Sequence, residues 1–254
     1  MLVVGFCKMY AATGMNTYKS AAIQCIQWLE KNCYDADAKN FYHSIANGQP
    51  KAHAFLDDYA NLIQAYIQLQ EITGDTSYLM KAKKWMEYVM AYFMDEEGVY
   101  FYYTACYQQD IILRKKESYD GAQPSGNALV CSSLYYLGHV FEFSHWTRHA
   151  ERMIASIRKS LIQYPGSFGH WAQSFYQMAY GMVELVGVGP TVNESLPSIL
   201  APFLPHTIRL ISHTENDQIP LLKGKKNADN QYFMCKNNTC SEPVPSIDLI
   251  LANI

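Results

Sequence analysis

An internal repeat constrains this sequence more than any other feature. Two segments match when one is slid along the other so that Thr13 falls on Thr73, and in each an amphipathic helix ends at Thr-Gly. Glycine can adopt the left-handed conformation that closes a helix. Repeats that each span a pair of helices are typical of stacked helical hairpins. The matched positions are Thr13-Gly14 with Thr73-Gly74, Tyr18 with Tyr78, Ala22 with Ala82, Asp35 with Asp95, and Phe41-Tyr42 with Phe101-Tyr102.

Each unit has the same order of elements. A second helix follows the Thr-Gly pair, and after it come an Asp-rich turn and a short aromatic strand. A diverged third unit has its helices over about 125–142 and 146–163, and a further helix follows over about 170–182, because apolar residues there recur at helical spacing. We therefore predict a mainly α chain in which residues 1–182 form helical hairpins.

The remaining segments have strand patterns. Between the second and third units we predict two short strands, over 99–104 and 111–114, joined by a turn. Near residue 183 the pattern changes to alternating strands and short helices, so residues 183–254 are predicted to form a small α/β subdomain. Its Gly187 and Gly189 form a GxG pattern, which a tight turn explains better than a phosphate-binding loop.

Charge and hydropathy exclude several classes of protein. The formal net charge is −3, and the cluster Lys223, Lys225 and Lys226 is too small to indicate a nucleic-acid partner. No apolar run is long enough to span a membrane. The first residues are apolar but lack a basic leader and contain a lysine, which indicates a core helix instead of a signal peptide. We expect a cytoplasmic protein.

The cysteines favour a reducing compartment. Their number is odd, and most lie in helical or strand patterns, so reduced buried thiols explain them best. A C-x4-C pair near the C-terminus lacks a second pair and suitably spaced histidines, so we expect no zinc site. The sequence indicates no metal and no organic cofactor. The cysteines are Cys7, Cys25, Cys33, Cys106, Cys131, Cys235 and Cys240.

Polar residues cluster at the starts of three first helices, within 53–59, 119–127 and 169–171. If the hairpins close into a toroid, the first helices run parallel along its axis and their N-terminal ends share one rim. This convergence predicts a functional site. The candidate acid–base residues are Asp57, Asp58 and Asp120. The candidate substrate-binding residues are His53, Tyr59, Arg114, Lys116, Ser125, Asn127 and His170.

The residue types fit a carbohydrate. Carboxylates and amides can hydrogen-bond hydroxyl groups, aromatic faces can cover a sugar ring, and paired carboxylates can act as acid and base. Structural roles are the alternatives. Asp57 or Asp58 can complement the helix dipole, and Ser125 can begin a helix. Ordinary core or surface placement is the alternative for both histidines. Arg114 and Lys116 can pair with Asp120 or bind an anion.

The motif YDGAxPSGN follows an LDDYA helix, and this combination is specific. On this motif, nearly the whole chain, in order, resembles the YyaL / spermatogenesis-associated protein 20 family. The resemblance implies an N-terminal thioredoxin-like domain followed by an (α/α)6 toroid related to N-acylglucosamine 2-epimerases and six-hairpin glycosidases. The similar segments are AFLDDYANLIQAYIQLQEITGD, FMDEEGVYFYYT, LRKKESYDGAQPSGN, VELVGVG, FLPHTIRLIS and YFMCKNNTCSEPV.

The chain departs from that pattern at its front. It has no counterpart of the thioredoxin-like domain, and it has fewer toroid helices than a closed ring needs. We therefore expect a partial toroid that is a C-terminal fragment or a shortened gene product. An open ring leaves apolar surface uncovered. We expect it to be covered by self-association or by the missing N-terminal part.

The sequence is compatible with two functions. The first is an enzyme cleft of the sugar epimerase, isomerase or glycosidase type, acting in carbohydrate metabolism on a sugar-like small molecule. The second is a non-catalytic binding or scaffold module, in which the rim residues only brace the fold.

Overall fold

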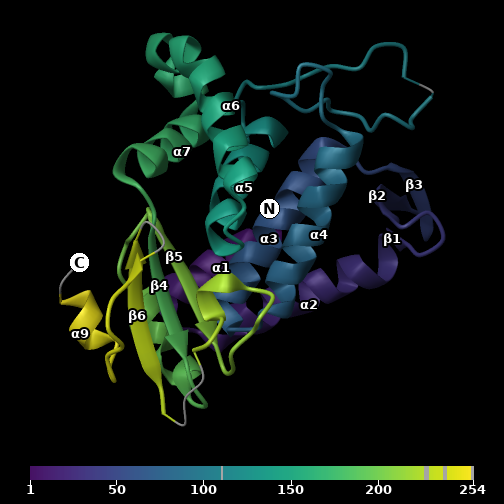
Figure 1. The fold of residues 1–254 in the computed structure, drawn as a ribbon. Helices are drawn as coiled ribbons and strands as arrows, with labels where there is room; N and C mark the ends of the chain where they lie inside the picture. Colours follow the sequence, from purple (N-terminus) through teal and green to yellow (C-terminus); the bar gives the residue numbers. More distant parts are fainter. Residues whose placement is uncertain (110, 226–228, 237–238, 253–254) are drawn as a thin grey trace.

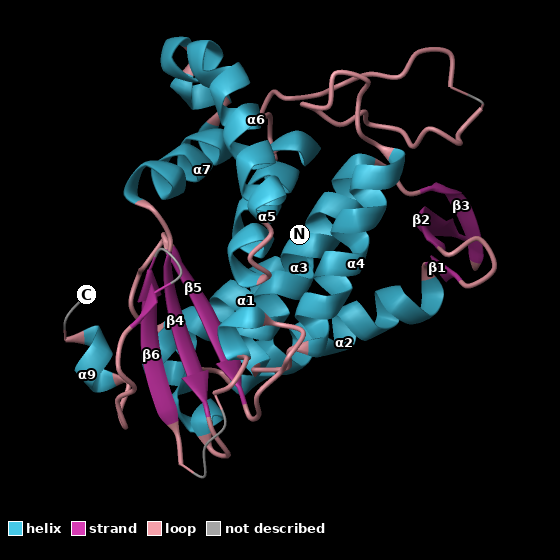
Figure 2. Cartoon of the chain, in the orientation of Figure 1, coloured by secondary structure: helices cyan, strands magenta, loops and turns pink. Residues whose placement is uncertain are grey.

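The computed structural model describes residues 1–109, 111–225, 229–236 and 239–252 (Figure 1). Helices make up the larger part of the molecule, and a sheet with short helices forms the C-terminal part (Figure 2). Lys226 of the predicted lysine cluster lies outside the described residues.

The helices form two rows. The first row consists of α1, α3, α5 and α7, each of which packs on the next. The second consists of α2, α4 and α6, which pack on α1, α3 and α5 as the second halves of hairpins. This is the arrangement of a partial α/α toroid, and the predicted fold class is confirmed. The helices are α1 (Leu2–Thr13), α2 (Asn16–Asn32), α3 (Leu56–Thr73), α4 (Ser77–Tyr92), α5 (Gly126–Val140), α6 (Ser144–Gln163) and α7 (Gly169–Tyr180).

The ends of the repeated helices are set by their caps. Gly14 follows α1 with φ 68° and Gly74 follows α3 with φ 73°, and the N–H of each donates to a carbonyl four residues earlier. These left-handed positions favour glycine because it lacks a Cβ atom. At the start of α5, the Ser125 hydroxyl accepts a hydrogen bond from the Ala128 N–H. The predicted helix start at Ser125 is therefore confirmed.

Small strands connect the first two hairpins. β1 (Tyr34–Asp35), β2 (Asn40–Ala46) and β3 (Gln49–His53) pair antiparallel in that order, and Phe41 and Tyr42 of the repeat lie in β2. The corresponding segment of the second unit differs. Met94 and Phe101 form an isolated bridge, and the described residues of 99–104 and 111–114 form no strands, so the predicted hairpin is wrong. Side-chain contacts from Asn127 hold this segment instead.

The C-terminal part is a sheet in the order β5-β4-β6-β7. β4 runs parallel to β5 and antiparallel to β6, and the predicted strand–helix–strand order is found. Gln70 of α3 donates a hydrogen bond to the Ile211 carbonyl of β5 at 3.3 Å, so the sheet packs on the end of α3. The domain division at residues 182 and 183 stays a prediction. The elements are β4 (Val183–Val188), η2 (Val192–Ser195), α8 (Leu196–Leu200), β5 (Thr207–Ser212), η3 (Pro220–Leu222), β6 (Gln231–Lys236), β7 (Thr239–Cys240) and α9 (Asp248–Leu251); η1 (Pro165–Ser167) precedes α7.

Packing accounts for the GxG pattern. A Cβ atom at Gly187, inside β4, would lie 2.9 Å from the Ile211 side chain, and one at Gly189 would meet Asn230. Both glycines therefore allow close packing within the sheet.

One prediction about the cysteines is wrong. Cys235 and Cys240 form a disulfide across β6 and β7, whereas we predicted reduced thiols throughout. Cys7, Cys33 and Cys131 are free and buried, as predicted. Sequence spacing alone could not show that two positions pair across a hairpin.

Among the described residues, no helix combines the length and the apolar character that a bilayer crossing requires. The cytoplasmic location stays a prediction.

The contact between α5 and α6 gives a test of the fold. A Cβ atom at Gly138 would lie 2.7 Å from the Thr147 side chain and 3.0 Å from the Thr147 backbone nitrogen. Gly138→Ala should therefore lower the free energy of unfolding by about 1–3 kcal/mol through overpacking. Gly5→Ala in α1, where a Cβ meets nothing within 4 Å, should raise it by about 0.5–1 kcal/mol. Urea denaturation checks both; equal effects would contradict the close approach of α5 and α6.

Candidate functional site

A cavity of about 510 Å³ lies at the N-terminal end of α3. Residues of α1, α2, β2 and α3 form its wall together with Tyr103 and Gln123 from the loop before α5. The N-terminus of the chain lies close to α3, and Met1 belongs to the cavity wall (Figure 1). Apolar side chains such as Leu29, Phe41 and Leu62 line part of the wall. The polar lining residues are Tyr42, His43, Asp57, Asp58, Asn61, Tyr103 and Gln123.

Asp57 is the carboxylate with the most unusual surroundings in this wall. It accepts a hydrogen bond from the Gly126 N–H at the start of α5, which ties α3 to α5. Burial raises the pKa of Asp57, and the negative charges of Glu117 and Asp58 raise it further, more than the Gly126 N–H lowers it. A carboxyl group in a cavity with a raised pKa is a candidate proton donor.

Asp58 has two partners of its own. The Phe55 N–H at the start of α3 donates to Asp58 Oδ2 at 2.9 Å. The same oxygen lies 2.8 Å from Nδ1 of His43, which β2 brings over the end of α3. Both side chains are partly exposed, so a ligand in the cavity can reach the pair. The predicted helix-start role of Asp58 is therefore present beside a histidine contact that the sequence did not indicate.

Aromatic rings occupy the same wall. Tyr59 is fully buried, and its hydroxyl accepts a hydrogen bond from the Phe41 N–H at 3.0 Å. Burial raises the pKa of Tyr59 to about 12, so its hydroxyl stays neutral and holds β2 against α3. Tyr103 stacks on Phe55 with ring centroids 4.8 Å apart and planes at 17°. These rings supply apolar faces next to the carboxylates.

Asp120 lies outside the lining of this cavity and is a structural connector. Its Oδ1 accepts hydrogen bonds from the Ser125 N–H at 2.9 Å and the Ser125 hydroxyl at 3.1 Å. Its Oδ2 accepts a hydrogen bond from the His170 N–H at 2.8 Å. Asp120 therefore joins the start of α5 to the start of α7, with both carboxylate oxygens engaged.

Asn127 is also engaged by backbone groups. Its Oδ1 accepts from the Phe101 N–H at 2.9 Å, and its Nδ2 donates to the carbonyls of Phe101 and Glu117 at 2.9 and 2.8 Å. The side chain is fully buried. Like a neighbouring strand, the Asn127 side chain pairs with both the N–H and the carbonyl of Phe101, and it also holds the loop before α5 through Glu117.

The expected pairing of Arg114 and Lys116 with Asp120 is wrong. Lys116 Nζ lies 2.8 Å from Asp95 Oδ2, and although burial alone would raise the pKa of Asp95, Lys116 and backbone donors lower it overall. Arg114 donates twice to the Thr104 carbonyl, at 3.2 and 2.8 Å, and its guanidinium lies 4.0 Å from the Tyr102 ring centre. Asp95 begins a tight turn, in which its carbonyl accepts a hydrogen bond from the Gly98 N–H. It pairs with the lysine that we assigned to Asp120 from proximity in the sequence.

The two candidate histidines lie in different places. His53 is in β3, stacks on Tyr42, and has Nδ1 3.4 Å from Asn40 Nδ2. His170 Nε2 lies 3.0 Å from the Ser132 hydroxyl of α5, and burial lowers the pKa of His170. Neither lines the cavity.

The starts of α3, α5 and α7 therefore lie near one another, as the predicted convergence requires. Asp57 connects α3 to α5, and Asp120 connects α5 to α7. Of the predicted site residues, Asp57, Asp58 and Tyr59 line the cavity, and the others brace the loops and helices around it. Their functional roles stay predictions. Among the described residues, no group of three or more His, Cys, Asp or Glu side chains is placed to hold a metal ion.

Sequence reasoning missed several polar residues of the wall. Asn61 follows Asp57 by one helical turn and donates to its carbonyl at 2.8 Å, so helical spacing could have found it. Gln123 lies within the YDGAQPSGN motif and could also have been named. His43 had no such signal, because only the fold-back of β2 brings it to Asp58.

Curated relatives match nearly the whole chain. An uncharacterized protein of Caenorhabditis elegans is 24% identical over 97% of this chain. Spermatogenesis-associated protein 20 is 20% identical over 96% of the chain in Mus musculus and 19% identical over 96% in Homo sapiens. The chain is a relative of the spermatogenesis-associated protein 20 proteins. The predicted resemblance to spermatogenesis-associated protein 20 is confirmed, although no family model matches the sequence, and the resemblance to YyaL stays a prediction.

The chain spans about a third of the length of these relatives, 36%, 33% and 34% respectively. The thioredoxin-like domain stays a prediction.

Two solved structures resemble part of the chain. A family 76 α-mannanase of Bacteroides thetaiotaomicron has a TM-score of 0.47 at 17% identity, over 62% of this chain and 39% of its own. A cellobiose 2-epimerase of Spirochaeta thermophila has a TM-score of 0.46 at 16% identity, over 61% of this chain and 41% of its own.

Because the pKa of Asp57 is raised, replacing this carboxyl group by a neutral amide should increase stability in a pH-dependent way. Ionised Asp57 is disfavoured in the folded state, so it lowers stability above its folded pKa and has no such effect below its unfolded pKa of about 4. Asp57→Asn should therefore raise the free energy of unfolding at pH 7, and the difference should shrink as the pH falls toward 4. Urea denaturation across this range checks the sign; a loss of stability at pH 7 would contradict it.

Asp120→Asn should act in the opposite direction. One of the three donors around Asp120 would then face an amide NH₂ group instead of an oxygen. Leaving a buried N–H without its acceptor costs about 1–3 kcal/mol of unfolding free energy. The same urea series measures it, and a change below about 0.5 kcal/mol, the usual size for surface substitutions, would show that Asp120 is not a connector.

Proposed function

We propose that the cavity at the N-terminal end of α3 binds a sugar-type ligand, with Asp57 and Asp58 as its acid–base pair. The observation that carries this is the placement of a carboxyl group with raised pKa beside a second carboxylate that contacts a histidine. Both belong to one wall of a cavity large enough for a small ligand.

The chemistry of the wall suits a polyhydroxylated ring. The carboxylates of Asp57 and Asp58 and the amide of Gln123 can hydrogen-bond hydroxyl groups, while Phe41 and Leu62 can cover the C–H faces of the ring. Asp57, held in its protonated form more readily than an ordinary aspartate, would donate a proton. Asp58 with His43 would accept one. This division suits epimerisation or glycoside cleavage.

A stability argument supports the assignment of Asp57. Burial and two neighbouring negative charges oppose its ionisation, so the residue is kept at the expense of folding free energy. Such a residue is more typical of a functional site than a carboxylate like Asp120, whose oxygens are all satisfied.

Ligand-induced thermal shift tests the proposal with a panel of monosaccharides, amino sugars and sugar phosphates. We expect at least one neutral sugar to raise the melting temperature. Asp57→Asn should weaken the binding of that ligand by about tenfold or more, because the amide NH₂ group would face a ligand group that pairs with a carboxyl oxygen and would leave it without a partner. Asp37→Asn, an exposed carboxylate in the β1–β2 turn, is the matched control and should bind as the parent does. Binding that survives in both Asp57→Asn and Asp58→Asn would remove these residues from the site.

A second candidate function is a non-catalytic packing module. The observation that favours it is a group of exposed apolar side chains on the α1–α2 hairpin: Leu2, Met9, Met15 and Trp28, which are 62%, 44%, 53% and 55% exposed. Association of copies, or of a further polypeptide, over this hairpin would cover them. Light scattering on the parent and on Trp28→Ser distinguishes the two: a parent that associates while the variant does not, with no sugar binding in either, favours the packing module.

A further inference from the structure

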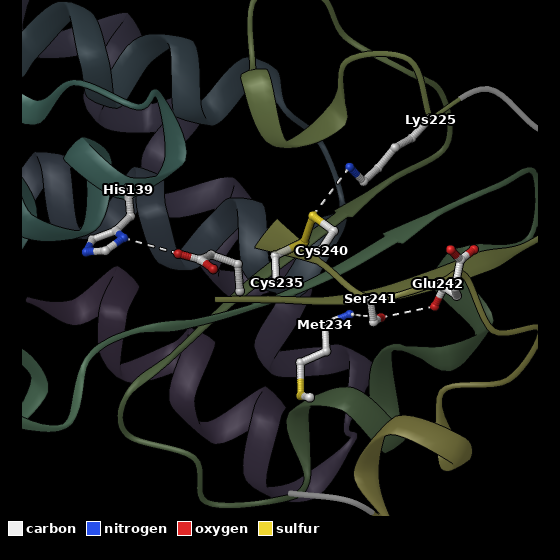
Figure 3. The surroundings of a disulfide bond; sticks show 8 residues. His139, Lys225, Met234, Cys235, Cys240, Ser241 and Glu242 are labelled. Carbon is white, nitrogen blue, oxygen red and sulfur yellow. Dashed lines mark hydrogen bonds and ion pairs between the residues drawn. A yellow bond between two sulfur atoms is a disulfide. The ribbon is translucent and has the colours of Figure 1, made fainter. Parts of the chain in front are cut away.

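Three side chains form a row across the C-terminal sheet. Cys235 of β6 is the register partner of Glu184 in β4 and of Cys240 in β7. Directly paired positions on antiparallel strands place their side chains on the same face of a sheet. The disulfide therefore lies next to Glu184 on one face, and Figure 3 shows His139 and Lys225 approaching this region from opposite sides.

The two sulfurs of the disulfide differ in their access to solvent and in the charge that lies near them. Cys235 is fully buried, whereas Cys240 is exposed. The Lys225 ammonium lies 3.8 Å from Cys240 Sγ and 4.8 Å from the centre of the Phe233 ring. Lys225 points toward the disulfide (Figure 3). An external thiol can thus reach Cys240, and a cation stands where a thiolate would attack or form.

Glu184 is incompletely satisfied in the disulfide form. Its Oε1 lies 3.1 Å from His139 Nδ1, but its Oε2 is buried without a hydrogen-bond partner. Such an oxygen is unfavourable in a protein interior. A disulfide sulfur has no proton to donate, whereas a Cys235 thiol would have one. Reduction would therefore supply a donor beside the unpaired oxygen.

We propose that Cys235–Cys240 is a thiol–disulfide exchange site for an external dithiol, with Cys240 as the attacked sulfur, Cys235 as the buried leaving group, and Lys225 as the positioning cation. The proposal is independent of the sugar-type cavity. It assigns a chemical role to a cysteine pair that the sequence alone did not distinguish from structural thiols.

The step balances in electrons and protons. A thiolate of the dithiol attacks Cys240 Sγ, the Cys235–Cys240 bond breaks, and Cys235 leaves as a thiolate that takes up a proton. The second thiol of the dithiol then loses its proton and attacks the first sulfur of the dithiol, which is bonded to Cys240 Sγ in the mixed disulfide. This step releases Cys240 as a thiolate beside Lys225. Two electrons pass from the dithiol to the protein. Of its two protons, one ends on Cys235 and the other in solvent.

Reduction kinetics test the role of Lys225. The folded chain is treated with dithiothreitol, quenched with an alkylating agent, and the Cys235 and Cys240 peptides are quantified by mass spectrometry. Lys225→Gln should slow reduction by about two- to fivefold, the effect expected of one partly exposed charge pair, and high salt should shrink the difference. Lys223→Gln removes the same charge two residues earlier in the same loop and should react as the parent does. Equal rates for the two variants would overturn the role of Lys225.

A pair of cysteine variants tests the direction of exchange. In Cys235→Ser the remaining Cys240 should form a mixed disulfide rapidly with an aromatic disulfide reagent, whereas in Cys240→Ser the buried Cys235 should react far more slowly. Circular dichroism confirms that both variants are folded, and peptide mapping separates these sites from Cys106, which is also exposed. Two results would overturn the proposal: equal reactivity of the two sulfurs, or reduction of the parent at a rate independent of dithiothreitol concentration, since that shows that unfolding must come first.

Discussion

The molecule depends on the way one partly buried carboxylate, Asp57, and one buried carboxylate, Asp120, join the starts of three helices. Asp57 accepts the Gly126 N–H and so links α3 to α5, and Asp120 accepts the N–H groups of Ser125 and His170 and so links α5 to α7. The first turn of a helix has N–H groups without partners inside the helix. Satisfying them across neighbouring helices aligns the N-terminal ends at one level. That alignment lets α3 and the loop before α5 contribute to one cavity.

Asp57 and Asp120 both accept N–H groups at the starts of neighbouring helices, but their surroundings differ. Asp120 receives three donors, so both of its oxygens are used in its role as a connector. Asp57 receives the Gly126 N–H while burial and the charges of Glu117 and Asp58 act against its ionised form. A site that needed only a connector would be more stable with an amide at Asp57. The disfavoured carboxyl group of Asp57 therefore distinguishes the proposed working site from a brace such as Asp120, and it lies in the cavity wall.

Local signals in the sequence were enough to predict the helices but not the side-chain contacts between distant residues. The Thr-Gly pairs fixed the ends of α1 and α3, and the apolar spacing located α5 to α7. The aromatic run near 99–104 has strand composition, yet Asn127 binds the backbone of Phe101 from the side and no strand forms there. Lys116 was assigned to Asp120 from its position in the chain, but the turn at Asp95 brings another carboxylate closer. His43 reaches Asp58 only through pairing of β2. Each miss concerns residues far apart in sequence, where period and propensity carry no information.

The two ends of the helix row have different chemistry. At the N-terminal ends of α3 and α5, Asp57 and Gly126 border the cavity. At their C-terminal ends, Gln70 binds β5 and His139 contacts Glu184 of β4, so the sheet is fixed to the same two helices. The sheet in turn holds Cys235 beside Glu184. Because α5 carries Gly126 at one end and His139 at the other, a change in the disulfide that acts through His139 reaches the cavity by moving this helix. The close packing of Gly138 against Thr147 resists such a movement, since any shift of α5 must displace α6 as well. The two sites are therefore expected to work separately on one rigid frame.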